Sequence, residues 1–206
     1  MVDQMVLKTQ QWLNTTYGSK TGFGSVSENG RTGWDTINAL IRALQIELGI
    51  TATANNFGAG TQSRFKNRWP NGISKTDSSS NVHGIIQGAL WCKGYPAEYG
   101  GITTKFTDNV ASSIRDVKSD IGLSSSSSTI DLELMMALLS MKQFKLLSAY
   151  GGKSAIRTAQ QAVNRQYKAY TGIIPTDGLY GREMNTALIQ VLQAIEGFTP
   201  AEATGN

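Results

Sequence analysis

The fold is decided by a stretch that occurs twice in the chain. Residues Asn29–Gln45 read NGRTGWDTINALIRALQ, and residues Asp177–Gln193 read DGLYGREMNTALIQVLQ. The two stretches align without a gap, so the Gly-x-x-Gly spacing, the Ala-Leu-Ile run and the Leu-Gln pair of the first all recur in the second. Upstream of them, VLKTQQWLN at Val6–Asn14 is answered by IRTAQQAVN at Ile156–Asn164. Self-similarity on this scale indicates tandem copies of one supersecondary unit.

Apolar residues fall at helical spacing on both sides of the repeated turn. In the first copy, one apolar stripe covers residues 5–13 and another covers residues 34–48. In the last copy, the two stripes cover residues 156–167 and 184–195. Stripes with this period indicate amphipathic helices, which must pack against one another to bury their apolar faces. The sequence therefore predicts an all-α fold built from helix pairs.

The segment that joins each helix pair predicts a tight turn. Glycine tolerates positive φ, and an Asn or Asp side chain can bond its own backbone, so Asn-Gly and Asp-Gly pairs suit such a turn. The predicted turn-forming residues are Asn29, Gly30, Gly33, Asp177, Gly178 and Gly181.

A weaker copy lies between the two strong ones. Its helical stripes fall within residues 82–89 and 110–121, but Thr103–Phe106 stands where the Gly-x-x-Gly turn should be. The serine run Ser124–Ser128 follows, and we interpret it as a loop inside this unit. Its composition alone would equally suit a flexible linker between domains.

We therefore expect three consecutive small three-helix units, at residues 1–69, 82–149 and 150–206. Residues 70–81 (PNGISKTDSSSN) have turn formers and no apolar periodicity, so we interpret them as a linker. The last unit shows no counterpart of Phe57-Gly58 and of the closing helix after it. We expect this unit to be incomplete, to leave apolar surface of its second helix uncovered, and to belong to a longer protein.

The order helix, Asp-Gly-x-x-Gly turn, helix, Phe-Gly-x-x-Thr turn and closing helix resembles the peptidoglycan-binding domain of bacterial wall hydrolases. In the first copy the residues that carry the resemblance are Gln10, Leu13, Asn29, Gly30, Gly33, Thr36, Ala39, Leu44, Gln45, Gly49, Phe57, Gly58 and Thr61. In the last copy they are Gln160, Val163, Asp177, Gly178, Tyr180, Gly181, Ala187, Leu192, Gln193 and Gly197. The order of units is also similar to the N-terminal part of Gram-positive and phage-associated proteins that end in a glycoside-hydrolase-like domain.

The resemblance implies a non-catalytic region that binds peptidoglycan and targets a larger protein, such as a wall hydrolase, to the cell wall. Its contacts would include a downstream catalytic domain. For ligand binding we select the residues beside the turns: Arg31 and Trp34 in the first copy, Tyr180 and Arg182 in the last. Aromatic faces pack against sugar rings, and arginine can hold a stem-peptide carboxylate in bidentate fashion. Trp34 also continues the apolar stripe of its helix, so a place in the core is the alternative for it.

Composition removes several other functions. The 206 residues hold a single histidine, His83, and a single cysteine, Cys92, so a zinc site with several histidines and a disulfide are both excluded; we expect no metal and no cofactor. Placed nine residues apart on one helix, the two would lie on opposite faces, which argues against a Cys–His nucleophile pair. We expect Cys92 to be a packing residue and His83 a surface or capping residue.

The net charge and the hydropathy of the chain exclude fewer partners than its His and Cys content does. A net charge of +4 favours an anionic partner without naming one. No apolar run approaches the ~20 residues of a membrane helix, so we expect no membrane contact. The start of the chain, Met1–Leu7, lacks the order of a signal peptide, which leaves the export route to an extracellular or cell-wall location open.

Two further functions compete with wall binding. A wall-lytic enzyme would need two carboxyl groups across the scissile bond, and the pairs Glu28 with Asp35 and Asp177 with Glu183 are formally available. Their places at turns and first helical turns suit solvation and the helix dipole better, so no catalytic residue is assigned. A helical interaction module is the third function, but the basic residues are too dispersed to predict a nucleic-acid groove.

Overall fold

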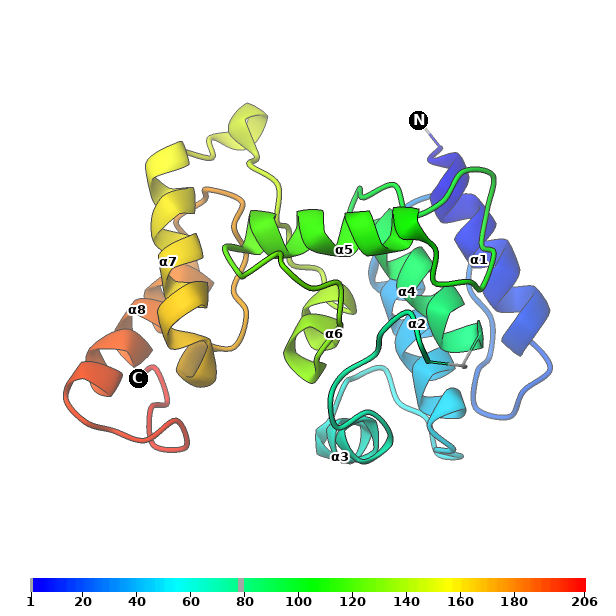
Figure 1. The fold of residues 1–206 in the computed structure, drawn as a ribbon, viewed down its shortest axis with the longest axis horizontal. Coiled ribbons are helices and arrows are strands. Elements are labelled where there is room, and N and C mark those ends of the chain that lie inside the picture. The colour runs from blue at the N-terminus through cyan, green and yellow to red at the C-terminus, as the bar shows by residue number, and fades with distance from the viewer. Residues whose placement is uncertain (1, 78–79) are drawn as a thin grey trace. The chain divides into compact units, whose positions relative to one another are not determined.

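The computed structural model describes residues 2–77 and 80–206, and in this part of the chain the all-α prediction is confirmed (Figure 1). Helices and turns account for all regular structure there, apart from one isolated antiparallel bridge between Ile73 and Ile130. The elements in order are α1 (Gln4–Tyr17), α2 (Trp34–Glu47), α3 (Ala59–Arg68), α4 (Ser80–Cys92), α5 (Asp108–Ile121), α6 (Leu132–Leu138), the 3₁₀ turn η1 (Ser148–Tyr150), α7 (Ser154–Thr171) and α8 (Arg182–Ile195).

The chain forms two compact units. Unit 1 consists of Met1–Ile114 and Ser128–Met141, and unit 2 of Arg115–Ser127 and Lys142–Asn206. The boundary passes through α5 and through the serine run, which has no regular structure; its interpretation as a loop inside one repeat stays a prediction. The division into three sequence repeats remains a prediction, although the helix order α1–α2–α3, α4–α5–α6 and α7–α8 follows it closely.

The core of unit 1 lies between α1, α2 and α4. Helix α4 packs against both members of the α1–α2 pair. Two glycines make this approach close, because a Cβ on Gly84 would lie 2.6 Å from the ring of Trp12 and a Cβ on Gly88 would lie 2.5 Å from the methyl group of Thr9. The fully buried apolar side chains there include Leu13, Ile37, Leu40, Leu44, Ile85, Ile86 and Leu90.

Residues 70–81 run from the end of α3 into the first turn of α4, within unit 1. Ile73 is fully buried and exchanges two backbone hydrogen bonds of 2.8 Å with Ile130, so part of the segment predicted as a linker is fixed to the loop before α6. Residues 78–79 of this segment lie outside the described part of the chain. Helix α6 is shorter than the apolar run of residues 129–144 that contains it.

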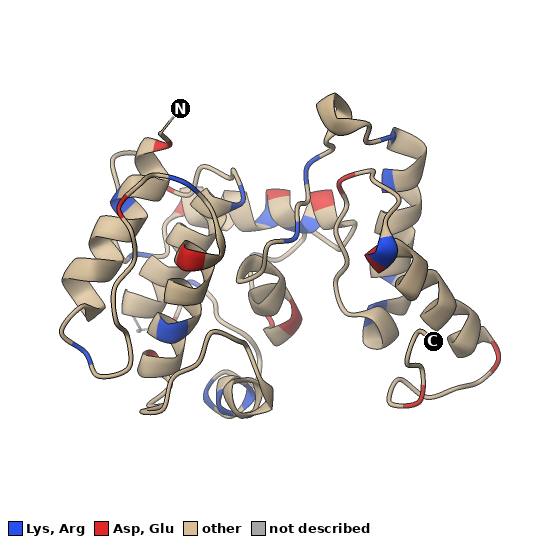
Figure 2. Cartoon of the chain, turned by 180° about the vertical axis from the view of Figure 1, so that it is seen from behind, with Lys and Arg blue, Asp and Glu red and all other residues tan. Residues whose placement is uncertain are grey.

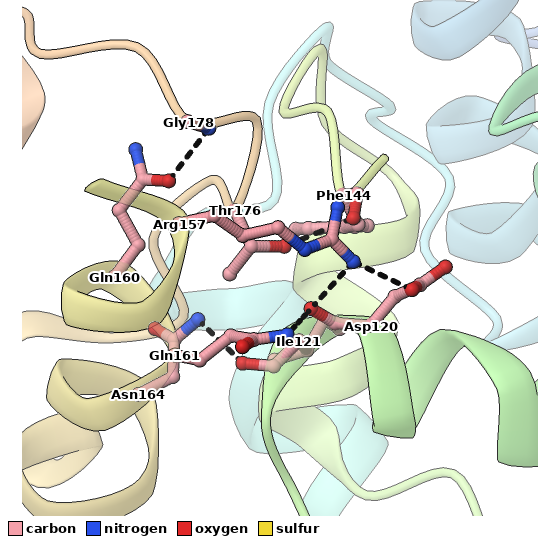
Figure 3. A network of polar contacts seen from close by, with 9 residues as sticks. All are labelled: Asp120, Ile121, Phe144, Arg157, Gln160, Gln161, Asn164, Thr176 and Gly178. Carbon is pink, nitrogen blue, oxygen red and sulfur yellow. Dashed lines mark hydrogen bonds and ion pairs between the residues drawn. The ribbon is translucent and has the colours of Figure 1, made fainter. Parts of the chain in front are cut away.

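Unit 2 is built on the α7–α8 pair and the second half of α5, from Arg115 to Ile121. Its small apolar core contains Val163, Ile174, Met184 and Ala187. Polar contacts join α7 to the end of α5 (Figure 3): Arg157 pairs with the carboxylate of Asp120 at 2.6 Å, and Asn164 donates to the carbonyl of Ile121 at 3.1 Å. The position of α7 is therefore set by hydrogen bonds as much as by apolar contact.

Apolar surface is exposed along α8, as the sequence predicted. Leu192 is 62% exposed and Ile195 is 64% exposed, and Phe198 just beyond the helix is 45% exposed. The equivalent of Leu192 in the first repeat, Leu44, is fully buried.

Candidate functional site

A buried glutamine on α1 organises the turn between α1 and α2. The side chain of Gln10 is inaccessible to solvent. Its Oε1 accepts hydrogen bonds from the backbone N–H groups of Asn29 (2.9 Å) and Gly30 (2.8 Å), while its Nε2 donates to Thr36 Oγ1 at 2.9 Å. An amide side chain has both a donor and an acceptor end, so one residue satisfies several groups of a loop that would otherwise be buried without partners.

The same clamp recurs in the last repeat. Gln160 on α7 accepts from the backbone N–H of Gly178 at 2.8 Å (Figure 3). Its Nε2 donates to Asp177 Oδ1 at 3.1 Å and to the carbonyl of Leu179 at 2.9 Å. The two strong repeats therefore hold their turns by one mechanism.

The middle repeat keeps the clamp although its turn has lost the glycines. Gln87 on α4 accepts from the backbone N–H of Thr103 at 2.9 Å and donates to the carbonyl of Lys105 at 2.6 Å. Sequence reasoning missed Gln87. The signal that could have found it is a glutamine on the buried face of the first helix of every repeat.

In each predicted turn, only one of the two glycines has a backbone conformation that favours glycine. Gly30 has a φ of +62° and Gly178 a φ of +79°. A Cβ on either would lie 2.8 Å from a backbone oxygen, that of Asp3 or that of Lys153. The N–H groups of the same two residues donate to the glycine carbonyls at 3.0 Å and 2.8 Å.

Gly33 and Gly181 differ from these, because each is the N-cap of the following helix. Both have extended backbone, and a Cβ on either would meet nothing within 4 Å. Because glycine has no side chain, neither N-cap residue can bond the first N–H groups of α2 and α8. Asn29 and Asp177 play their predicted part, each accepting a hydrogen bond of 2.9 Å from the N–H two residues ahead.

All four residues selected for ligand binding are exposed. Trp34 and Arg182 are the first residues of α2 and α8, and they occupy equivalent positions in the two repeats. Trp34 is 62% exposed, so the alternative that it belongs to the core is wrong. Tyr180 is 59% exposed, and its hydroxyl lies 3.3 Å from Asn185 Oδ1. Arg31 is exposed just before α2. Their role in binding stays a prediction.

Arg182 lines a hollow of about 260 Å³ in unit 2, and in the sequence Tyr180 stands between two further lining residues, Leu179 and Gly181. Its walls combine apolar side chains with the polar groups of the clamped turn and the start of α8. The lining residues are Gln160, Ile174, Pro175, Asp177, Leu179, Gly181, Arg182, Glu183 and Met184. Because the N-terminal end of a helix carries partial positive charge, this end of α8 together with the guanidinium of Arg182 favours an anionic group.

The carboxylates considered for catalysis all have structural partners. Glu28 accepts from Asn14 Nδ2 at 2.8 Å, and Asp35 accepts from the backbone N–H of Ser27 at 2.9 Å. Glu183 pairs with Lys142 at 2.7 Å. Asp177 is part of the Gln160 clamp. These bonds fit the interpretation of the carboxylates as turn and helix-end residues.

The single histidine does not lie where the sequence predicted it. His83 is only 5% exposed and packs edge-on against the ring of Phe106, with 5.4 Å between ring centroids, so its assignment as a surface or capping residue is wrong. Burial lowers the pKa of His83 against the opposing effect of Asp77 and the Ser74 backbone. Cys92 is a buried packing residue as expected, and burial raises the pKa of its thiol to about 11.

Among residues 2–77 and 80–206, no group of three or more His, Cys, Asp or Glu side chains is arranged to hold a metal ion. No helix in the same part of the chain is both long enough and apolar enough to cross a bilayer.

Charge is distributed without a dominant stripe. Figure 2 shows Lys and Arg interspersed with Asp and Glu on the helices of both units. The most basic short element is α3, but its arginines point back onto the protein, since Arg64 donates to the carbonyl of Leu48 (3.3 Å) and Arg68 to that of Glu47 (2.9 Å). They neutralise the negative C-terminal end of α2.

Helix pairs joined by glutamine-clamped turns define the class of this protein as a small all-α domain built on repeated helix–turn–helix units. Residues 2–131 match the family model "FadG/YbfG, PGDB-like domain". The chain therefore belongs to the FadG/YbfG PGDB-like domain family, which confirms the resemblance read from the repeats. The matched range spans the first repeat and most of the middle one.

Two relatives match over the whole chain. "Uncharacterized protein YbfG" of Bacillus subtilis (strain 168) is 49% identical over 206 residues, which are 100% of this chain and 27% of that protein. "Uncharacterized protein FadG" of the same organism is 41% identical over 207 residues, 100% of this chain and 35% of that protein. The chain thus spans about a third or less of these longer relatives. No solved structure matches it.

Proposed function

We propose that this chain is a non-catalytic peptidoglycan-binding region that targets a larger protein to the bacterial cell wall. Membership of the PGDB-like family supports a wall ligand. The observation that carries the proposal is the site of the last repeat, where the exposed Arg182 lines a hollow of about 260 Å³ and the exposed Tyr180 lies between two of its lining residues in the sequence. The clamp of Gln160 holds the hollow in shape before any ligand arrives, which reduces the entropic cost of binding.

The chemistry of this site suits a peptidoglycan strand with its stem peptides. The ring of Tyr180 offers an aromatic face for a sugar or for an alanine methyl group. Arg182 and the positive end of α8 offer donors for a stem-peptide carboxylate. In the first repeat, Trp34 and Arg31 offer the same pair of groups, with the aromatic ring now at the first position of the helix.

The test is co-sedimentation of the chain with purified sacculi. The double variant Tyr180→Ala, Arg182→Ala should bind at least about fivefold more weakly, because exposed aromatic and arginine side chains at such sites carry much of the binding energy. Tyr150→Ala is the matched control, since Tyr150 is a 79% exposed tyrosine in the same unit and is not one of the hollow's lining residues. Equal binding by the double variant and the control would contradict the assignment of this site.

The first repeat is tested in the same assay with Arg31→Ala, Trp34→Ala. A further loss of affinity when these changes are added to the double variant is expected if both turns bind. A loss with these changes alone, and none with Tyr180→Ala, Arg182→Ala, would place binding in the first repeat only and overturn the site beside α8.

The proposal also predicts no lytic activity. The chain alone should leave the turbidity of a wall suspension unchanged over the period in which lysozyme clears it. Clearance that is lost in a variant with Glu28, Asp35, Asp177 and Glu183 all replaced by their amides would support the wall-lytic alternative instead.

A further inference from the structure

One side of α8 carries an apolar stripe that unit 2 covers only in part: Leu188 and Val191 pack against its core, and the rest of the stripe is exposed. The stripe consists of Leu188, Val191, Leu192 and Ile195, spaced three and four residues apart. Leu188 and Val191 are half-buried, while Leu192 and Ile195 are more than 60% exposed. We call these four residues the α8 stripe. Apolar side chains gathered in this way on one helix face mark a surface that is covered in the working molecule.

The first repeat shows what covers such a face. Leu40, Ala43 and Leu44 of α2 are the equivalents of Leu188, Val191 and Leu192, and all three are fully buried. Helix α4 lies on this side of α2 and also contacts α1. A Cβ on Gly88 of α4 would lie 3.2 Å from Leu40, so α4 meets the stripe at close range.

The neighbouring face of α7 fits the same kind of helix. Thr9 and Trp12 of α1 contact the glycines of α4, and their equivalents on α7 are Ala159 and Ala162. Ala159 is exposed and Ala162 is half-buried. Because both are small, a helix laid across the α7–α8 pair could approach at least as closely as α4 approaches α1–α2.

The segment after α8 covers a different side of that helix. Gly205 donates its N–H to Gln193 Oε1 at 3.0 Å, and a Cβ on Gly205 would lie 2.5 Å from Thr186. Thr186 and Gln193 lie opposite the α8 stripe on the helix. The tail therefore leaves the stripe free.

We propose that the α8 stripe and the adjacent alanines of α7 dock an amphipathic helix of the α4 type, supplied by another part of the same longer protein. We expect the docked helix to share the pattern of α4. It would have two small residues spaced four apart, as Gly84 and Gly88 are, together with large apolar residues such as Ile85 and Leu90. The relatives support this source, because this chain corresponds to only 27% of YbfG and 35% of FadG, so proteins of this family contain much further sequence. A second copy of this chain fits less well, since the precedent is one helix on a helix pair and an isologous dimer would bring two pairs together.

Hydrogen exchange of the α8 amides tests the docking. We compare the 206-residue chain with the full-length protein, and expect exchange in the second half of α8 to slow at least tenfold in the longer form. Leu192→Asp should abolish the slowing, because a charge cannot be buried in the apolar contact. Tyr150→Asp adds the same charge at an exposed aromatic residue of unit 2 outside the face, and should leave the slowing intact.

Two other outcomes, no docking and self-association of the chain, are distinguished with the same proteins and variants. Unchanged exchange of α8 in the full-length protein overturns the proposal. So does a dimer of the 206-residue chain, seen by sedimentation velocity at micromolar concentration, that Leu192→Asp dissociates and Tyr150→Asp does not. Since Leu192 is largely exposed, Leu192→Asp should fold, and unchanged exchange of the α7 amides next to α5 checks this. Wall binding beside Tyr180 is measured separately and does not depend on the outcome.

Discussion

At the scale of single residues, the recurring feature is a buried glutamine that pairs with backbone atoms of a loop. Gln10, Gln87 and Gln160 lie on the first helix of each repeat and bond turns 16 to 20 residues ahead. Sequence comparison shows that a glutamine recurs in the two strong repeats. It does not show the clamp, because the partners are backbone groups, which are the same in every sequence.

Replacing the clamp should cost considerable stability. Gln10→Ala removes the partner of the buried N–H of Gly30 and of the part-buried N–H of Asn29, and we expect a loss of roughly 2–4 kcal/mol in the free energy of unfolding. Urea unfolding followed by tryptophan fluorescence measures it, since Trp12, Trp34, Trp69 and Trp91 all belong to unit 1. Gln11→Ala, at the exposed neighbouring position, is the control and should change stability by less than about 0.5 kcal/mol. Equal effects of the two changes would show that the clamp does not hold the turn.

The two glycines of the first turn should respond differently to alanine. At Gly30 the φ of +62° and the close backbone of Asp3 both oppose a side chain, so Gly30→Ala should destabilise unit 1 by about 1–3 kcal/mol. At Gly33 the backbone is extended and the space is open, so Gly33→Ala should be close to neutral. The same fluorescence-detected unfolding compares them, and a larger loss at Gly33 would contradict the geometry of the turn.

The buried thiol of Cys92 gives unit 1 a dependence on alkaline pH. Its pKa is raised from 9.0 in the unfolded chain to about 11 in the folded protein, so the folded state holds the proton more tightly. Its contribution is therefore full below about pH 9 and is lost as the pH rises toward 11. Cys92→Ala should flatten the decline of unfolding free energy between these pH values by about 2 kcal/mol relative to the native chain. Parallel declines in the two proteins would show that the thiol is not buried.

At the scale of helices, the apolar period located the paired elements of all three repeats, because the stripes are long and their turns carry strong signals. Other features could not be read in this way. The burial of His83 involves Phe106, which lies outside its helix, and α6 begins after the side-chain cap of Asp131 and ends at Leu138, inside its apolar run. The site was predicted as residues beside a turn. The hollow itself appears only when α7, the turn and the start of α8 are placed together.

Replacing a helical glycine by alanine should change the stability of unit 1 in opposite directions at a crowded site in α4 and at an open site in α3. Gly84→Ala places a methyl group against the ring of Trp12 and should destabilise unit 1, although alanine favours a helix by about 1 kcal/mol over glycine. Gly60→Ala in α3, where the space is open, should stabilise by about 0.5–1 kcal/mol. Thermal unfolding measures both. A gain at Gly84 would mean that α4 does not lie as close to α1 as described.

At the scale of the whole chain, two exposed surfaces suit different partners. The first is beside the clamped turns, where an aromatic ring and an arginine stand next to the start of a helix, and where Arg182 lines a hollow. The second is the purely apolar α8 stripe, which suits a protein helix rather than a hydrated polymer. A region that binds the wall with one surface and the rest of a longer protein with the other would serve as a targeting module.

The most direct measurement is the binding isotherm of the 206-residue chain on purified sacculi at physiological ionic strength, with teichoic acids and proteins removed. We expect saturable binding that soluble peptidoglycan fragments displace, and that Tyr180→Ala, Arg182→Ala weakens while Tyr150→Ala does not. Binding that is absent, or that vanishes once the anionic teichoic acids are removed, would contradict peptidoglycan binding and leave only the positive net charge of the chain to explain any attachment to walls.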